Sequence, residues 1–272
     1  MKNRIPSDAY AIIIGAMKSG TSSLYGYLIQ HPQVCRAKTK EPEFFSRNQQ
    51  HGLQVDNYEN IWKFKRDQHR IALEASTGYS KYPTETNIPE RILNYGINPK
   101  FIYVVRNPID RIVSQYVFSE KVLHQKSSDI LSEHGVALSR YHMQLEEYRK
   151  CFSKKRILIV DFSELTNHPQ KTLDKVCDFL NIASFEPKIN RILKKSVEPN
   201  ALKTFINTHL SGILRISPEW LKSPLRSLLI KEVVLERPTL SEDQINYLKQ
   251  ELSGDMAKFS EEYDFDVKQW GF

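Results

Sequence analysis

The chain contains few cysteines, and its three are too far apart to act together. Cys35, Cys151 and Cys177 show neither a CxxC spacing nor a histidine-rich neighbourhood. This pattern argues against a zinc site and against a disulfide framework. It predicts three reduced, buried thiols.

Long apolar runs are also lacking. No stretch approaches the roughly 18 apolar residues of a membrane-spanning helix. The apolar run within residues 1–17 is too short for a signal peptide and is more typical of a strand. We therefore expect no transmembrane segment, and a cytoplasmic enzyme is the default expectation.

Dense basic tracts are missing, although the formal net charge is +7. The basic excess would attract anionic molecules, but the longest patches, such as Lys194-Lys195 and Lys154-Lys155-Arg156, are short. Nucleic-acid tracts are denser and are interleaved with stacking aromatics. The charge pattern predicts solvated surface side chains and no nucleic-acid partner.

What is present is the composition of a soluble globular protein, with 40% hydrophobic and 26% charged residues. We expect a single domain over residues 1–272. Four unbroken apolar runs predict strands that are buried on both faces, as in a parallel sheet covered by helices. These runs are Ala11–Ile14, Ile71–Leu73, Phe101–Val105 and Ile157–Val160, and Val34-Cys35 is a candidate for a short fifth strand.

Helical patterns alternate with these runs. They cover Thr21–Gln30, Pro108–Leu123, Pro169–Leu180 and a last helix from Ser241 to about Tyr263. Asn107 is placed to cap the second helix, and Ser241 and Gln244 have capping-box spacing. The alternation predicts a three-layer, P-loop-like α/β fold with a mostly parallel central sheet. Residues 183–240 break the pattern and are expected to form a helical, basic segment that covers the site.

The segment from Gly15 to Leu24 joins the first strand to the first helix through a loop of small residues. Backbone N–H groups at such a helix start converge on one point and bind anions. Lys18 adds a positive charge, and Thr21 and Ser22 add hydroxyl donors. The loop differs from a Walker A motif, because Thr21 stands where GxxxxGK[ST] requires lysine. The alternative is a Gly/Ser turn with a solvent-exposed lysine.

A second candidate anion site follows the strand Phe101–Val105. Arg106 is placed at the carboxyl end of that strand, where open α/β sheets bind ligands. Ser114 lies seven residues after Asn107 and returns to the same side of the helix. An arginine side chain together with a hydroxyl group suits a phosphate. Alternatively, Arg106 could form a salt bridge with Asp110, and Ser114 could be a neutral surface residue.

Together these motifs resemble those of sulfotransferases that use 3′-phosphoadenosine 5′-phosphosulfate (PAPS). Lys18-Ser19-Gly20-Thr21-Ser22 resembles their 5′-phosphosulfate loop, and residues 106–116 resemble their 3′-phosphate motif, RxPxxRxxSxY. The likeness covers roughly three quarters of the chain, and the paired motifs are specific. It extends through Lys40-Glu41-Pro42-Glu43-Phe44-Phe45, residues 73–79 and residues 156–180, and it returns in the last helix up to Trp270.

The Glu-x-x-Phe-Phe pattern points to the carbohydrate branch of this family, the heparan-sulfate type. The resemblance implies metal-independent, in-line transfer of a sulfuryl group from PAPS to an acceptor hydroxyl, with 3′-phosphoadenosine 5′-phosphate (PAP) as product. It implies Glu41 as the general base, and Lys18 is placed to stabilise the leaving phosphate oxygen. Glu41 could instead pair with Lys38 or Lys40. Glu43 is a weaker candidate base, and Glu74 could orient Lys18 or the substrate, or only tether the sheet edge.

The chain departs from the heparan-sulfate type at two acceptor-side positions. Glu43 stands in place of a histidine and Ala75 in place of a lysine, which puts an acidic glycosaminoglycan acceptor in doubt. For the basic loop that closes over the cofactor in that family, only Lys231 and Arg237 are candidates. If no carboxylate serves as the base, the next candidates are His31, His51 and His124.

Two rival functions remain at the level of sequence. A nucleotide or small-molecule kinase shares the strand–loop–helix phosphate site, but Arg106 stands where a kinase of this type needs a magnesium-binding acid. A non-catalytic module for membranes or polyanions would use the basic, amphipathic stretch Leu210–Val234. Such a stripe more often packs on its own domain or on a second subunit, which leaves a homodimer open.

Overall fold

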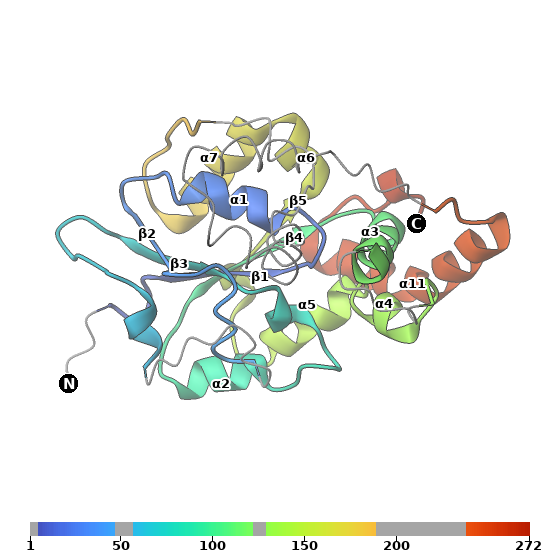
Figure 1. Ribbon diagram of the computed structural model, residues 1–272, viewed down its shortest axis with the longest axis horizontal. Coiled ribbons are helices and arrows are strands. Elements are labelled where there is room, and N and C mark those ends of the chain that lie inside the picture. Colours follow the sequence, from blue (N-terminus) through green and yellow to red (C-terminus); the bar gives the residue numbers. More distant parts are fainter. Residues whose placement is uncertain (1–4, 47–56, 122–128, 189–237) are drawn as a thin grey trace, which may run out of the picture.

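A five-stranded parallel sheet forms the centre of the protein (Figure 1). The computed structural model describes residues 5–46, 57–121, 129–188 and 238–272. The strands are β1 (Tyr10–Gly15), β2 (Val34–Arg36), β3 (Ile71–Ala75), β4 (Lys100–Val105) and β5 (Ile157–Asp161), in the order β2-β3-β1-β4-β5. All four neighbouring pairs are parallel. The predicted sheet, including its short fifth strand, is confirmed.

The register brings the carboxyl ends of the strands together at one edge. Ile13 of β1 pairs with Ala75 of β3 and with Ile102 of β4. The β1–β4 pairing is irregular between Ile13 and Gly15. The segments that follow β1, β3 and β4 therefore start side by side, which is where open α/β sheets bind ligands.

Helices cover both faces of the sheet. Residues of β1 alternate between two buried clusters, so that Ile13 packs with the layer of α1 (Thr21–Leu28) and α7 (Pro169–Leu180). Ile12 packs with the other layer, which includes α5 (Tyr141–Arg149). That second layer also contains α2 (Ile88–Asn94), and Figure 1 shows the two layers on opposite sides of the strands. Buried residues of α11 (Glu242–Tyr263) pack into the same cluster. This is the three-layer arrangement that the sequence predicts.

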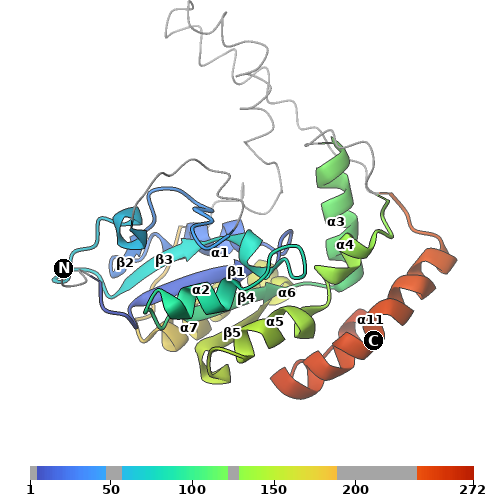
Figure 2. The ribbon, with the colours of Figure 1, turned by 90° about the horizontal axis from the view of Figure 1, so that it is seen from below.

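A further helical group stands beside the two layers, and its first helix starts three residues after β4 ends. α3 (Pro108–Lys121) and α4 (Glu133–Ala137) pack against each other, and α11 contacts both α4 and α5 (Figure 2). The short α6 (Phe162–Asn167) follows β5 directly. Single 3₁₀ turns occur at Tyr58–Ile61, Thr77–Ser80, Lys154–Arg156 and Lys268–Trp270.

The predicted helix caps are present. The Asn107 Oδ1 atom accepts from the backbone N–H groups of Ile109 (3.0 Å) and Asp110 (3.3 Å) at the start of α3. Ser241 and Gln244 form the full capping box of α11. The first helix is shorter than predicted and ends at Leu28.

The three cysteines are free thiols, with Cys35 and Cys177 buried and Cys151 partly exposed, so full burial was wrong for Cys151. Within the described part of the chain, every helix is too short or too polar to cross a bilayer. Residues 183–188 and 238–240 of the predicted covering segment are irregular rather than helical. The remainder of that segment, including Lys231, Arg237 and the stretch Leu210–Val234, lies outside the described residues. The single-domain boundary of 1–272 stays a prediction.

Candidate active site

The loop between β1 and α1 is shaped by glycines at both ends. Gly15 has a φ of +153°, and a Cβ there would lie 2.0 Å from the Ser80 Oγ atom. Gly20 has a φ of +88°, and a Cβ there would lie 2.7 Å from the ring of Phe162. Both conformations are strained for any other residue, and both positions lack room for a side chain. The Gly15-to-Gly20 spacing therefore reflects close approach of the loop backbone to its neighbours.

The amino end of α1 opens onto this loop. Gly20 is its N-cap, no side chain caps it, and its first turn holds no acidic residue. Free N–H groups and the helix dipole make such an end favourable for an anion. Ser19 and Thr21 are buried and Ser22 is exposed. The loop and its donors thus fit a phosphate or sulfate group, although the role of each predicted residue stays a prediction.

Lys18 carries the full positive charge of the loop. Its φ is +68°, and its ammonium lies 4.2 Å from the centre of the Phe118 ring on α3. The contact is a cation–π interaction. It holds the ammonium toward α3, the helix that also carries Ser114, which is half-buried about two turns into the helix.

Arg106 connects the two predicted anion motifs. Its guanidinium lies at the end of β4, 5.0 Å from the centre of the Phe162 ring, and its side chain is only 10% exposed. Nη1 donates to the carbonyl oxygen of Lys18 at 3.5 Å. The alternative partner Asp110 is also in contact, with 3.4 Å between Nη2 and Oδ2. That distance is long and the Asp110 side chain is 58% exposed, so the pair is weak.

Arg111, in the same motif, is fully buried. Its donors reach Ser139 Oγ (2.6 Å), Gln115 Oε1 (2.7 Å) and the Gly135 carbonyl (2.7 Å). All three partners are neutral, and burial lowers the pKa of the guanidinium. Arg111 therefore fastens α3 to α4 and is not exposed to a ligand. The sequence placed it in the motif but did not indicate its burial.

Glu41 lies at the carboxyl edge of the sheet, on the loop that follows β2. Its backbone has a φ of +57°, and its N–H donates to the carbonyl of Ala75 at the end of β3 (2.8 Å). Its side chain is 29% exposed and pairs with the ammonium of Lys40. The ion pair between neighbours that the sequence left open is thus present, on a carboxylate that solvent can reach.

Glu43, by contrast, is buried and turned inward. Its carboxylate accepts from Ser46 Oγ (2.6 Å) and from the backbone N–H of Gly78 (2.8 Å). Its own N–H donates to Ser76 Oγ (3.2 Å). Burial raises the pKa of the Glu43 carboxyl group. Glu43 fastens the loop that carries Glu41 to the segment after β3.

Glu74, in β3, is fully buried behind this loop. It accepts from the Tyr58 hydroxyl (2.6 Å) and from Ser76 Oγ (3.1 Å), and burial raises its pKa to about 8. Ser76 thus links Glu74 to the backbone of Glu43. These contacts fit the tethering alternative for Glu74. Neither of these two partners is Lys18, and a role in orienting Lys18 or the substrate stays a prediction.

Of the three fallback bases the structure describes only His31, which lies before the start of β2 and therefore away from this edge. His31 is buried, its Nδ1 accepts from the N–H of Gln33 (3.0 Å), and its Nε2 lies 2.9 Å from the carbonyl of Ala183. Both ring nitrogens therefore form hydrogen bonds with backbone groups, and Nε2 carries the proton. His51 and His124 lie outside the described residues. Within the described ranges no three His, Cys, Asp or Glu side chains could hold a metal together, and metal independence stays a prediction.

Comparison with known proteins points to one family. Residues 8–221 match the sulfotransferase domain. Human heparan sulfate glucosamine 3-O-sulfotransferase 5 is 29% identical over 188 residues, which are 63% of this chain and 53% of the relative. The mouse 3-O-sulfotransferase 3A1 is 30% identical over 188 residues, which are 63% and 45%. The chain thus spans about half the length of the curated relatives it matches.

Solved structures agree on the fold. A sulfotransferase from Alicyclobacillus acidocaldarius has a TM-score of 0.59 at 22% identity, covering 84% of this chain and 98% of that one. The sulfotransferase domain from the curacin biosynthetic pathway has a TM-score of 0.50 at 18% identity, covering 92% and 99%. Identities this low speak for the fold alone.

The predicted cytoplasmic location is wrong. The relatives are heparan sulfate 3-O-sulfotransferases, which are enzymes of the Golgi lumen. The prediction rested on the lack of a leader-like run and of a membrane-spanning run, and such absences carry no information on location.

Proposed function

Since the chain belongs to the sulfotransferase family, we propose that it transfers a sulfuryl group from PAPS to an acceptor hydroxyl, and that the acceptor is a carbohydrate. The observation that carries the proposal is the contact between Arg106 and the phosphate loop. Its Nη1 atom lies 3.5 Å from the Lys18 carbonyl, so the two anion motifs, distant in sequence, lie next to each other. A ligand with two separated phosphates matches such a site.

The binding roles follow from the donors at this edge. The 5′-phosphosulfate group is assigned to Lys18, Ser19, Gly20, Thr21 and Ser22, and the 3′-phosphate to Arg106 and Ser114. Two features support the first assignment. No side chain caps the amino end of α1, and Gly20 has no side chain where the loop backbone packs closely against Phe162. The packing of Arg106 on Phe162 supports the second, because an arginine held on a ring keeps its fork in place.

When bound, PAPS supplies the sulfuryl group. Lys18 stabilises negative charge on the departing phosphate oxygen, and Glu41 accepts the proton of the acceptor hydroxyl as the new S–O bond forms. Glu41 suits this role better than Glu43, because its carboxylate is accessible whereas both Glu43 oxygens accept bonds inside the protein. The ion pair with Lys40 is partly exposed and therefore weak enough to exchange for an acceptor.

A carbohydrate acceptor is supported by relatives that are named for sulfation of heparan sulfate. The acceptor we propose is less acidic than that polymer. Ala75 is fully buried in β3, and Glu43 faces inward, so neither position presents a cation to an acceptor. A sugar hydroxyl without dense neighbouring sulfates fits these residues best.

A screen with radiolabelled PAPS tests the function directly. Label is expected to pass to a sugar or polysaccharide, in the presence of EDTA, and not to phenols or lipids. PAP is expected to raise the melting temperature without magnesium, while ATP is not. Magnesium-dependent stabilisation by ATP, with no response to PAP, would instead identify a kinase.

A further inference from the structure

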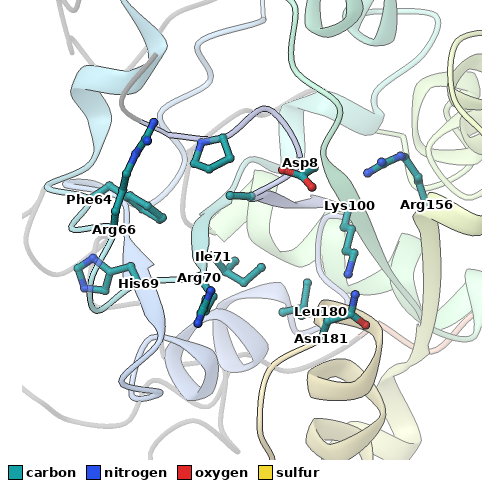
Figure 3. A pocket seen from close by; sticks show the side chains of 12 residues that line it. Asp8, Phe64, Arg66, His69, Arg70, Ile71, Lys100, Arg156, Leu180 and Asn181 are labelled. Atoms are coloured by element: carbon teal, nitrogen blue, oxygen red, sulfur yellow. The ribbon is translucent and has the colours of Figure 1, made fainter. Parts of the chain in front are cut away.

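A cavity of about 530 Å³ opens at the edge of the sheet opposite the phosphate loop. Its walls come from the amino ends of the strands, including Ile71 of β3, Lys100 of β4 and Arg156 just before β5. Since all strands are parallel, this edge lies a full strand length away from Lys18 and Glu41. Figure 3 shows basic side chains on both sides of the hollow. The volume is that of a site for a small ligand.

The charge of the lining is strongly unbalanced. Four cationic side chains line the cavity, Arg66, Arg70, Lys100 and Arg156, against the single carboxylate of Asp8. Within the described ranges, Arg70, Lys100 and Arg156 form no ion pair with a carboxylate. Cations gathered in a partly enclosed space create a positive potential that an anion relieves.

Two of the cations are held in place by neutral partners. The Lys100 ammonium donates to the carbonyl of Phe179 (2.6 Å), and Arg156 Nη1 donates to the carbonyl of Asn98 (2.6 Å). The end of α7 offsets part of the Lys100 charge. Burial and the nearby Arg156 nevertheless lower the pKa of Lys100. Both cations are ordered before any ligand arrives, which reduces the entropy lost on binding.

The floor of the cavity is apolar. Ile71 and Leu180 are buried there, and Phe64 is half-buried at the side. His69 adds a polar rim, and burial together with Lys65 lowers its pKa, which favours the neutral ring. A ligand with an anionic group and a compact ring could contact the cationic side chains through the anionic group and the apolar floor through the ring.

We propose that this cavity is an additional anion site, separate from the two anion motifs at the catalytic edge, for a small ligand that carries a sulfate or phosphate ester. The esters share a tetrahedral oxyanion that arginine forks bind well. Arg70 and Arg156 provide the specific contacts, and Lys100 provides charge from the inner wall.

Methyl NMR of the full chain locates the binding without any turnover. We expect the methyl signals of Ile71 and Leu180 to shift in a saturable way with sodium sulfate or phosphate, but not with sodium chloride of equal ionic strength. Glucose 6-sulfate and glucose 6-phosphate should bind more tightly than the inorganic ions, and glucose should not bind. The ratio of the two ester affinities tells which ester the cavity prefers. If no anion shifts Ile71 and Leu180 beyond the chloride control, the proposal is wrong.

Three variants give the matched control. Arg70→Glu and Arg156→Gln should each weaken ester binding about tenfold or more, the scale of one charge-assisted contact. Lys258→Glu makes the same charge change as Arg70→Glu on the exposed face of α11 and should leave the affinity unchanged. Equal weakening by Lys258→Glu would mean general surface attraction and would overturn the site. These binding measurements need neither PAP nor sulfuryl transfer. A negative result would therefore leave the proposed function intact, and failure of the proposed function would leave the anion site intact.

Discussion

The contact between Gly78 and Glu43 makes the substitution Gly78→Ala informative. A Cβ at residue 78 would lie 2.1 Å from the Glu43 Oε2 atom and 2.7 Å from its Cδ atom. The φ of Gly78 is not in the left-handed region, so alanine suits the backbone. The whole effect therefore comes from displacing the carboxylate. Glu43 then loses its bonds to Ser46 Oγ and to the Gly78 N–H.

Each of these hydrogen bonds to a carboxylate contributes roughly 1–2 kcal/mol net to stability. We therefore expect Gly78→Ala to lower the free energy of unfolding by about 2–4 kcal/mol. For a domain of this size the melting temperature should fall by roughly 5–15 °C. Turnover should fall as well, because the loop with Glu41 loses its anchor. PAP affinity should stay within a few-fold, since no contact of Glu43 involves the phosphate loop.

The measurements are thermal and urea unfolding, PAP titration and sulfuryl transfer. In a Glu43→Ala background the same Gly78→Ala change should cost less than about 0.5 kcal/mol, because the clash is gone. Gly254→Ala is the matched control: a Cβ there meets nothing within 4 Å, and it lies inside α11. It should stabilise by about 0.5–1 kcal/mol. An equal cost of Gly78→Ala in both backgrounds would refute the reasoning.

Two further predictions concern Arg106 and Glu74. Arg106→Ala should weaken PAP binding by about 2–3 kcal/mol in calorimetry and barely affect an analogue without the 3′-phosphate; equal losses for both ligands would place the 3′ site elsewhere. Burial raises the pKa of Glu74 from 4.5 to about 8, so the folded state keeps a proton that the unfolded state releases between these values. The free energy of unfolding should therefore fall as pH rises from about 5 to about 8. Glu74→Gln should flatten that part of the stability–pH curve, and an unchanged slope would show that Glu74 ionises normally.

Local sequence signals were enough for the sheet and the helix caps. Unbroken apolar runs such as Phe101–Val105 specify buried strands because they have no polar face to expose. Asn107 and Ser241 specify helix starts because their side chains satisfy backbone donors within a few residues. These interactions join residues that are close in sequence, so the local sequence pattern is sufficient to predict them.

The orientation of the acidic residues could not be predicted in the same way. Glu41 and Glu43 are two residues apart and equally acidic, yet one is accessible and the other is buried. The difference arises from Gly78, 35 residues away, whose N–H and missing side chain make room for Glu43. Arg111 is a similar case, since its partner Ser139 is contributed by a distant segment. The cavity at the amino edge also combines residues from five separate segments, so no motif indicates it.

The most direct test of the proposed chemistry is a comparison of Glu41→Gln with Glu43→Gln in single-turnover sulfation, once an acceptor is found. Glutamine keeps the shape of Glu41 but cannot take the hydroxyl proton. Glu41→Gln should leave PAP affinity and the melting temperature unchanged and lower the transfer rate by about 10²–10⁴, the usual contribution of a general base. Glu43→Gln should act mainly on stability. Normal transfer by Glu41→Gln, with loss of transfer and unchanged stability in Glu43→Gln, would contradict the assignment of Glu41 as the base.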